Sequence, residues 1–200
     1  CRVRALESTP PRARARFQKI PMTYKNRVIL ILSVLAICVV LDQVTKRMAI
    51  AWLMGQPPLI YLDDFFRLQY AENTGAFLGL FGKMSETVRQ VLLVGFNSVI
   101  LAVVSAFLFF SRDLTRMVIV ALALILAGGV GNLIDRIAYG GIVVDYMNMG
   151  LPWVSIRGWE PRTGIFNVAD LAIVGGLVLM VIAEFFKPAV PERAPETASE

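Results

Sequence analysis

The 200-residue chain contains no histidine and only two cysteines, Cys1 and Cys38. The absence of histidine removes the most common general base and the most common zinc ligand. Cys38 lies in an apolar run, and two isolated cysteines indicate neither a disulfide framework nor a metal site. We therefore expect the protein to hold no metal.

Charged residues are also scarce, at 18% of the chain against 56% hydrophobic residues, and the mean hydropathy is +0.64. A soluble domain is closer to half apolar and a quarter charged, and about 20 mostly apolar residues suffice to span a bilayer as a helix. Four stretches meet that requirement: 28–53, 88–110, 117–134 and 165–186. The sequence therefore predicts an α-helical integral membrane protein with four transmembrane helices.

The net charge of +5 is concentrated in two places. One is the segment before the first predicted span, and the other is the short link between the second and third spans, which contains Arg112 and Arg116. Basic residues in short flanks mark the cytoplasmic side of a membrane. Both termini are therefore predicted to be cytoplasmic. This explanation of the basic N-terminal segment is favoured over nucleic-acid binding because a membrane span follows directly.

The two ends of the chain differ in composition from its centre. Residues 1–21 are rich in arginine and proline without an apolar period, and residues 188–200 are rich in proline and glutamate. Such segments cannot bury enough apolar surface to fold. We expect a disordered basic extension, a membrane domain over 22–187 and a disordered tail.

Two longer segments join the spans on the predicted outer side. Residues 65–70 partly alternate in polarity, residues 141–146 are typical of a short strand, and 153–156 is a candidate for another. We expect a small extracytoplasmic β-sheet. The aromatic residues of this region are predicted to anchor at the membrane interface: Trp52, Tyr61, Trp153 and Trp159.

Two aspartates stand in unfavourable surroundings. Asp170 opens the fourth apolar stretch with no basic residue within a helical turn, and Asp145 lies among hydrophobic neighbours in the loop before it. A carboxylate near lipid costs several kcal/mol on some scales, so one that persists is a candidate functional group. A pair at one depth suggests two carboxylates that share a proton, and hence an enzyme that works within a membrane.

Other polar residues are predicted to meet this pair. At about 1.5 Å per helical residue, Asp42, Asn132 and Asp170 all fall in the outer third of the bilayer. The i, i+3 and i, i+4 spacings place Asn132, Asp135 and Arg136 on one helix face. Glycines 128, 129 and 131 permit close approach of a neighbouring helix. The alternatives are ordinary ion pairs (Asp42–Lys46, Asp135–Arg136) and interhelical hydrogen bonds of Asn132 and Asn167, and spacing alone leaves them open.

Four blocks of the chain resemble bacterial lipoprotein signal peptidase, also called signal peptidase II. They are Leu41-Asp42-Gln43-Val44-Thr45-Lys46, Glu72-Asn73-Thr74-Gly75-Ala76-Phe77, Gly128-Gly129-Val130-Gly131-Asn132-Leu133-Ile134-Asp135-Arg136 with Val143-Val144-Asp145-Tyr146, and Phe166-Asn167-Val168-Ala169-Asp170. Their order and the four-span layout also match. The stretch between the two aspartates is long for the family, with 150–161 as the apparent insertion, and Tyr146 stands where phenylalanine is common.

The resemblance implies an aspartic membrane endopeptidase, a hydrolase that cuts prolipoproteins just before their diacylglyceryl-modified cysteine. It implies that Asp145 and Asp170 are the catalytic dyad and that Asn132, Arg136 and Asn167 order the dyad and the substrate backbone. Asp42, Asn73 and Asp135 would support the site or the substrate. It implies a monomer whose partners are the prolipoprotein and membrane lipid, with no nucleic acid and no cofactor.

Other classes fit the chain less well. A serine–lysine signal peptidase would need a serine near Lys46, and Ser155 stands in a weak context. A proton-coupled transporter is disfavoured because four spans show no internal repeat. A scaffold would not need Asp170, and a presenilin-type protease would need a Gly-x-Gly-Asp block, which neither aspartate has.

Overall fold

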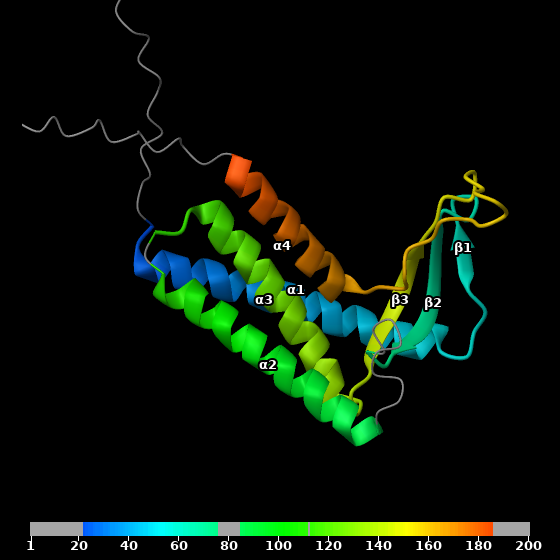
Figure 1. Cartoon of the computed structure of the whole chain (residues 1–200), viewed down its shortest axis with the longest axis horizontal. Helices are drawn as coiled ribbons and strands as arrows, with labels where there is room; N and C mark the ends of the chain where they lie inside the picture. The colour runs from blue at the N-terminus through cyan, green and yellow to red at the C-terminus, as the bar shows by residue number, and fades with distance from the viewer. Residues whose placement is uncertain (1–21, 76–84, 112, 186–200) are drawn as a thin grey trace, which may run out of the picture.

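A computed structural model describes residues 22–75, 85–111 and 113–185. The predicted disordered ends, 1–21 and 188–200, lie outside the described residues. Four helices form a bundle, and a small sheet lies at one end of it (Figure 1). The helices are α1 (Tyr24–Leu53), α2 (Glu86–Phe110), α3 (Arg116–Ala138) and α4 (Val168–Phe185).

Each of the four helices is long and apolar enough to cross a membrane, as the sequence predicts. Three begin slightly earlier than their apolar stretches because a hydroxyl side chain caps the first turn. Thr23, Ser85 and Thr115 accept hydrogen bonds from the backbone N–H groups three residues on. Such caps satisfy donors that the helix itself leaves unpaired.

The bundle is apolar outside and carries charge inside. Large apolar side chains such as Phe96, Val103 and Val174 are exposed, whereas Asp42, Lys46 and Asp135 are at most 2% exposed. This is the reverse of a soluble protein and suits a lipid environment, in which charged side chains face the bundle interior. An apolar cluster fills the other part of the interior, around Ile31, Leu108, Ile119, Leu122 and Leu126.

Helices α3 and α4 approach closely through glycines. A Cβ atom on Gly128 would collide with the carbonyl oxygen of Ala169, and one on Gly176 would lie 2.5 Å from the carbonyl oxygen of Ala121. A Cβ atom on Gly131 would lie 2.6 Å from Oδ2 of Asp42, on α1. The predicted role of the glycines of the third span, close helix approach, is thus confirmed at Gly128 and Gly131.

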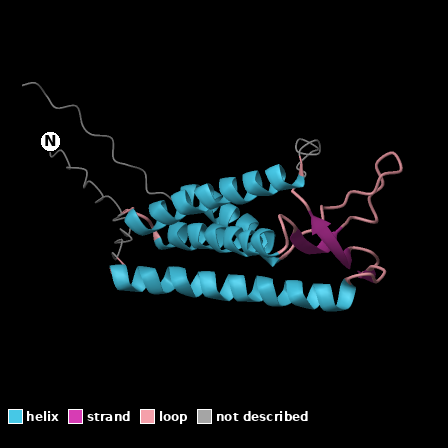
Figure 2. Ribbon diagram, turned by 90° about the horizontal axis from the view of Figure 1, so that it is seen from below, coloured by secondary structure: helices cyan, strands magenta, loops and turns pink. Residues whose placement is uncertain are grey.

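The sheet has three antiparallel strands in the order β1 (Leu59–Tyr61), β2 (Phe66–Asn73) and β3 (Val143–Met149). The sheet lies at one end of the helix bundle, as Figure 2 shows, and it contacts α1 and α3. The sequence misses β1 and misplaces one strand: Ile156 forms only an isolated bridge with Trp159. The register of β2 against β3 shifts between Leu68 and Ala71, so that Ala71 lies opposite Asp145. Bulges of this kind re-aim side chains beside functional sites.

Candidate active site

The fold brings the two unusual aspartates to one place. Asp145 lies in β3 and is 2% exposed, and Asp170 is the third residue of α4. The strand crosses the end of the bundle near the start of α4 (Figure 1), and the backbone N–H groups of Tyr146 and Met147 donate to the carbonyl oxygen of Phe166. The segment before α4 is therefore fastened to the strand that carries Asp145.

Asn167 bonds to both aspartates. Its Nδ2 atom donates to Oδ1 of Asp145 at 2.6 Å, and its Oδ1 atom accepts from the backbone N–H of Asp170 at 2.9 Å. The backbone N–H of Asn167 donates in turn to Oδ2 of Asp170 at 3.2 Å. This reciprocal pair is a capping box, with Asn167 as N-cap and Asp170 as the third helical residue. It explains why α4 begins at Val168 and not at the predicted residue 165.

Two further asparagines complete the hydrogen bonds of the aspartates. Nδ2 of Asn132 donates to Oδ1 of Asp170 at 2.9 Å, and its Oδ1 accepts from Asn167 at 3.1 Å. Nδ2 of Asn73 donates to Oδ2 of Asp145 at 3.0 Å, while its Oδ1 accepts from the N–H of Gly75 at 2.9 Å. All four carboxylate oxygens of the pair therefore accept a hydrogen bond from an asparagine.

The surroundings shift the pKa of Asp145. Burial raises the pKa of this carboxyl to about 6, and the negative charge of Asp170 acts in the same direction. The hydrogen bonds from Asn73 and Asn167 and the charge of Lys46 oppose the rise in its pKa. A carboxyl whose pKa lies near 6 can hold or release a proton close to neutral pH, which suits general acid–base chemistry.

A buried ionic cluster of Asp42, Lys46 and Asp135 lies beside the aspartate pair. Nζ of Lys46 lies 2.9 Å from Oδ2 of Asp42 and 2.9 Å from Oδ2 of Asp135. Of the two ion pairs that the sequence leaves open, the structure contains Asp42–Lys46, whereas Asp135 pairs with Lys46 and not with Arg136. Gln43, which the sequence does not single out as a site residue, donates to Oδ1 of Asp135 at 2.9 Å and to the carbonyl of Gly131 at 3.2 Å.

Arg136 is near the site but is not joined to it by hydrogen bonds in the part of the chain that the structure describes. Its Nε and Nη1 atoms are buried and have no partner there. Buried donors normally bond, so two such groups suit a ligand that brings acceptors, such as a peptide backbone. Of the predicted site residues, the structure thus joins Asp42, Asn73, Asn132, Asp135 and Asn167 to the two aspartates directly or through Lys46, and leaves Arg136 aside.

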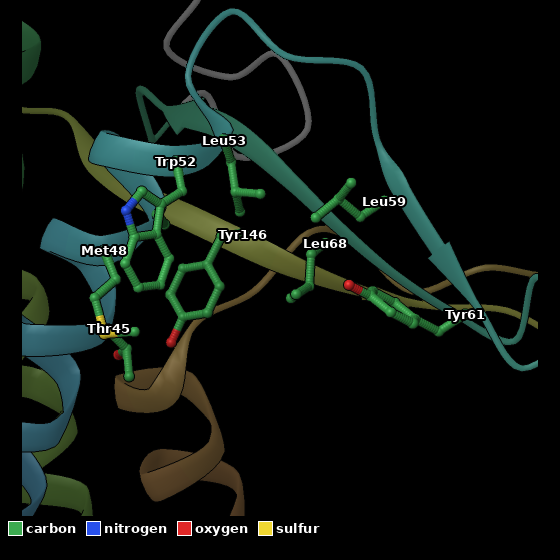
Figure 3. A pocket seen from close by; sticks show the side chains of 9 residues that line it. Thr45, Met48, Trp52, Leu53, Leu59, Tyr61, Leu68 and Tyr146 are labelled. Atoms are coloured by element: carbon green, nitrogen blue, oxygen red, sulfur yellow. The ribbon is translucent and has the colours of Figure 1, made fainter.

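An apolar pocket of about 350 Å³ lies beyond Tyr146, the residue after Asp145. Figure 3 shows Thr45, Met48 and Trp52 of α1 on one side of it and Leu59, Leu68 and Tyr61 of the sheet on the other. Trp52 is 67% exposed. Tyr146, which follows Asp145 in β3, lines this apolar pocket at the C-terminal end of α1.

The sequence profile of one protein family, described as signal peptidase (SPase) II, matches residues 34–186. The chain belongs to the signal peptidase II family. This signal peptidase II is an endopeptidase, a hydrolase that removes signal peptides from prolipoproteins, and it is a multi-pass membrane protein.

Individual relatives agree. The chain is 36% identical over 148 residues to a lipoprotein signal peptidase of Chlorobium phaeobacteroides, a match that covers 74% of this chain and 84% of that protein. It is 36% identical over 168 residues to the lipoprotein signal peptidase of Pelodictyon phaeoclathratiforme, covering 83% and 95%. A solved structure of a bacterial membrane enzyme has the same fold, with a TM-score of 0.63 at 24% identity, over 84% of this chain and 97% of that one.

Proposed function

We propose that Asp145 and Asp170 are the catalytic dyad of this signal peptidase II. The observation that carries the proposal is that one side chain, Asn167, bonds to both aspartates although they come from a strand and a helix. Such a bridge supports a dyad that is held in place before substrate arrives. Pre-organised groups of this kind lose little free energy in reorganisation during the reaction.

The dyad would work with one shared proton. Two neighbouring carboxylates cannot both ionise cheaply, and the raised pKa of Asp145 supports the retention of a proton near neutral pH. The ionised member accepts a proton from a water molecule as that water attacks the scissile carbonyl. The protonated member donates a hydrogen bond to the carbonyl oxygen. The proton belongs to the pair, and the scheme needs no metal or cofactor.

We further propose that the substrate is a diacylglyceryl-modified prolipoprotein, cut immediately before its lipidated cysteine. Acyl chains anchor a peptide to the bilayer surface. The dyad would lie at that depth, because Asp145 follows the end of α3 and Asp170 is the third residue of α4. The unpartnered Nε and Nη1 of Arg136 suit the carbonyl groups of the bound peptide. The enzyme would act as a monomer, because asparagines of the same chain already supply a donor to each carboxylate oxygen of the pair.

The basic segments support an orientation with both termini in the cytoplasm of a bacterial inner membrane and the dyad near the outer face. Single cysteines at Asp63 and Asp113, in a background with Cys1 and Cys38 both changed to alanine, test it with an impermeant thiol reagent on intact cells. Labelling at position 63 and protection at position 113 are expected. The reverse pattern would reject the orientation.

The dyad is tested by cleavage of a purified diacylglyceryl prolipoprotein by Asp145→Asn and Asp170→Asn, made separately. Each variant should lose activity by several orders of magnitude while remaining folded. Asp63→Asn is the matched control, because Asp63 is an exposed carboxylate of the outer segment. If either dyad variant cleaves at the wild-type rate, the assignment is wrong. Wild-type protein that moves protons or solute but cuts nothing would point to a transporter.

A further inference from the structure

Lys46 is a buried charge for which the proposed chemistry has no direct use. It lies in α1 and is 2% exposed. An ammonium group has three N–H donors and no acceptor. Three acceptors surround it: Oδ2 of Asp42 at 2.9 Å, Oδ2 of Asp135 at 2.9 Å and Oδ1 of Asn132 at 3.0 Å. All three N–H donors of Lys46 are therefore used, and all three acceptors belong to residues of the candidate site.

The contact with Asn132 determines which way that amide faces. The two ends of an asparagine amide have the same shape, and their partners decide the orientation. Because Lys46 only donates, the oxygen of Asn132 must face it, and the nitrogen is then directed to Oδ1 of Asp170 at 2.9 Å. Without the ammonium, that oxygen keeps only the donor Nδ2 of Asn167 at 3.1 Å, so the amide that donates to Asp170 is held less firmly.

The two carboxylates that contact Lys46, those of Asp42 and Asp135, each accept a hydrogen bond from the backbone N–H directly before one dyad residue. Oδ1 of Asp42 accepts from the N–H of Ala169 at 2.9 Å, directly before Asp170. Oδ2 of Asp135 accepts from the N–H of Val144 at 3.1 Å, directly before Asp145. Lys46 is thus connected to each dyad residue in the same way: through one carboxylate and the backbone N–H of the residue that precedes the aspartate.

We propose that Lys46 is a positioning residue for hydrolysis, which orients the amide of Asn132 toward Asp170 and aligns the backbone before both dyad residues through Asp42 and Asp135. The proposal rests on the proposed dyad. It assigns to Lys46 a role beyond an ordinary ion pair at a helix end, because a mere ion pair would not need the contact with Asn132.

The first test is Lys46→Met, which keeps the length of the side chain and removes its charge. Loss of a hydrogen-bonded supporting group typically costs about 10- to 100-fold, and we expect that loss in kcat with little change in KM, because substrate contacts remain. The acid limb of the kcat profile should move to higher pH, because the positive charge of Lys46 lowers the pKa of Asp145. Other titratable or charged groups beside the dyad are Asp42, Asp135 and Arg136, and this variant leaves all three in place. Arg47→Met is the control: it removes an exposed positive charge one residue along α1.

A second variant separates positioning from simple charge balance. Lys46→Met leaves two buried carboxylates without a partner, which lowers stability by itself. Asp42→Asn/Lys46→Met has the net charge of the wild type, and the new amide oxygen can still accept from Ala169. We expect this double variant to recover most of the melting temperature and the wild-type acid limb but to keep the reduced plateau of kcat, because Asn132 still lacks the contact with the ammonium group.

Each result of these experiments either supports or overturns the role proposed for Lys46. Wild-type kcat in Lys46→Met, or full recovery of kcat together with stability in the double variant, would overturn the proposal. If the single variant does not fold, the double variant alone decides. Failure of the dyad itself is distinguishable, because it would appear as wild-type cleavage by Asp145→Asn or Asp170→Asn, whatever the Lys46 variants do.

Discussion

Nδ2 of Asn167 lies 2.6 Å from Oδ1 of Asp145, across the junction between strand β3 and helix α4. The same side chain caps α4, because its Oδ1 atom accepts from the N–H of Asp170 at 2.9 Å. One asparagine thus begins the helix that carries one aspartate and donates to the other. Stability of the helix and order of the dyad are coupled at this residue, and substitutions can separate the two roles.

Asn167→Ser and Asn167→Ala form a matched pair. Serine keeps an oxygen that caps the helix but loses the donor to Asp145, whereas alanine loses both. Alanine should cost about 1 kcal/mol of stability and serine much less. Both should lower kcat about 10- to 100-fold, the worth of one hydrogen bond to a charged group. Melting curves and cleavage rates measure the two effects. Wild-type kcat in Asn167→Ser would mean that the bond to Asp145 is dispensable.

The capping box also shows where sequence reasoning falls short. The position of the fourth span follows from its apolar composition, but its start is misplaced by three residues. An Asn-x-x-Asp spacing is a helix-start signal, and it was available at Asn167 and Asp170. From the sequence, Asp170 is predicted to belong to the carboxylate pair but not to a capping box. It is both a helix-start residue and a dyad candidate.

Residue spacing along the sequence does not predict which side chains of different helices contact each other. The i, i+4 spacing predicts the pair of Lys46 with Asp42, but the partner of Asp135 comes from a different helix. Adjacency favours Arg136 for that role, although successive residues of a helix point about 100° apart. Strand β1 is missed for a related reason: three residues after two prolines are too few to alternate, and pairing with β2 defines them.

The raised pKa of Asp145 predicts that this carboxylate lowers stability at neutral pH. Unfolding returns the side chain to its ordinary pKa of 3.8, whereas burial raises the pKa to about 6 in the folded protein. The folded protein then binds more protons between these two values, so stability falls as pH rises through that window. The loss above about pH 6 is on the order of 3 kcal/mol. Asp145→Asn should lack it and melt higher than the wild type at pH 7 but not at pH 4.

Melting temperatures of the two proteins in one detergent, taken from pH 4 to 8, measure the difference. Other titrating groups are common to both and largely cancel. A difference that is constant across this range would contradict the assigned pKa. A wild type that gains relative stability as pH rises would reverse its sign.

Arg162 fixes the long segment that follows β3, residues 150–161, to the turn before β2. Its Nη2 atom lies 2.5 Å from Oδ2 of Asp64 and donates to the carbonyl oxygen of Asp64 at 2.7 Å, and its Nη1 donates to Asn148 at 3.1 Å. We expect Arg162→Ala to speed protease cleavage within residues 151–160 several-fold while kcat stays within about twofold, because none of these contacts reaches the dyad. Arg157→Ala, an exposed arginine of the same segment, is the control. Equal cleavage rates in the two variants would show that strand pairing alone holds the segment.

We expect activity to depend on the close approach of α3 and α4 at Gly128. A methyl group there would strike the carbonyl oxygen of Ala169, directly before Asp170, and would lie 2.7 Å from Cγ1 of Ile173. Gly128→Ala should therefore cost about 1–3 kcal/mol by overpacking and also lower kcat, because α4 must shift at the end that carries Asp170.

Two other glycines of the bundle provide the comparison. Gly176→Ala meets the carbonyl oxygen of Ala121 at 2.5 Å, farther along α4, and should cost similar stability with a smaller loss of kcat. Gly175→Ala meets nothing within 4 Å and should be neutral or slightly stabilising, because alanine favours a helix. Melting temperature and kcat measured on all three separate packing from placement of the dyad. Equal losses of kcat in Gly128→Ala and Gly176→Ala would mean that activity follows bundle stability alone, and that the contact at Ala169 has no special part in it.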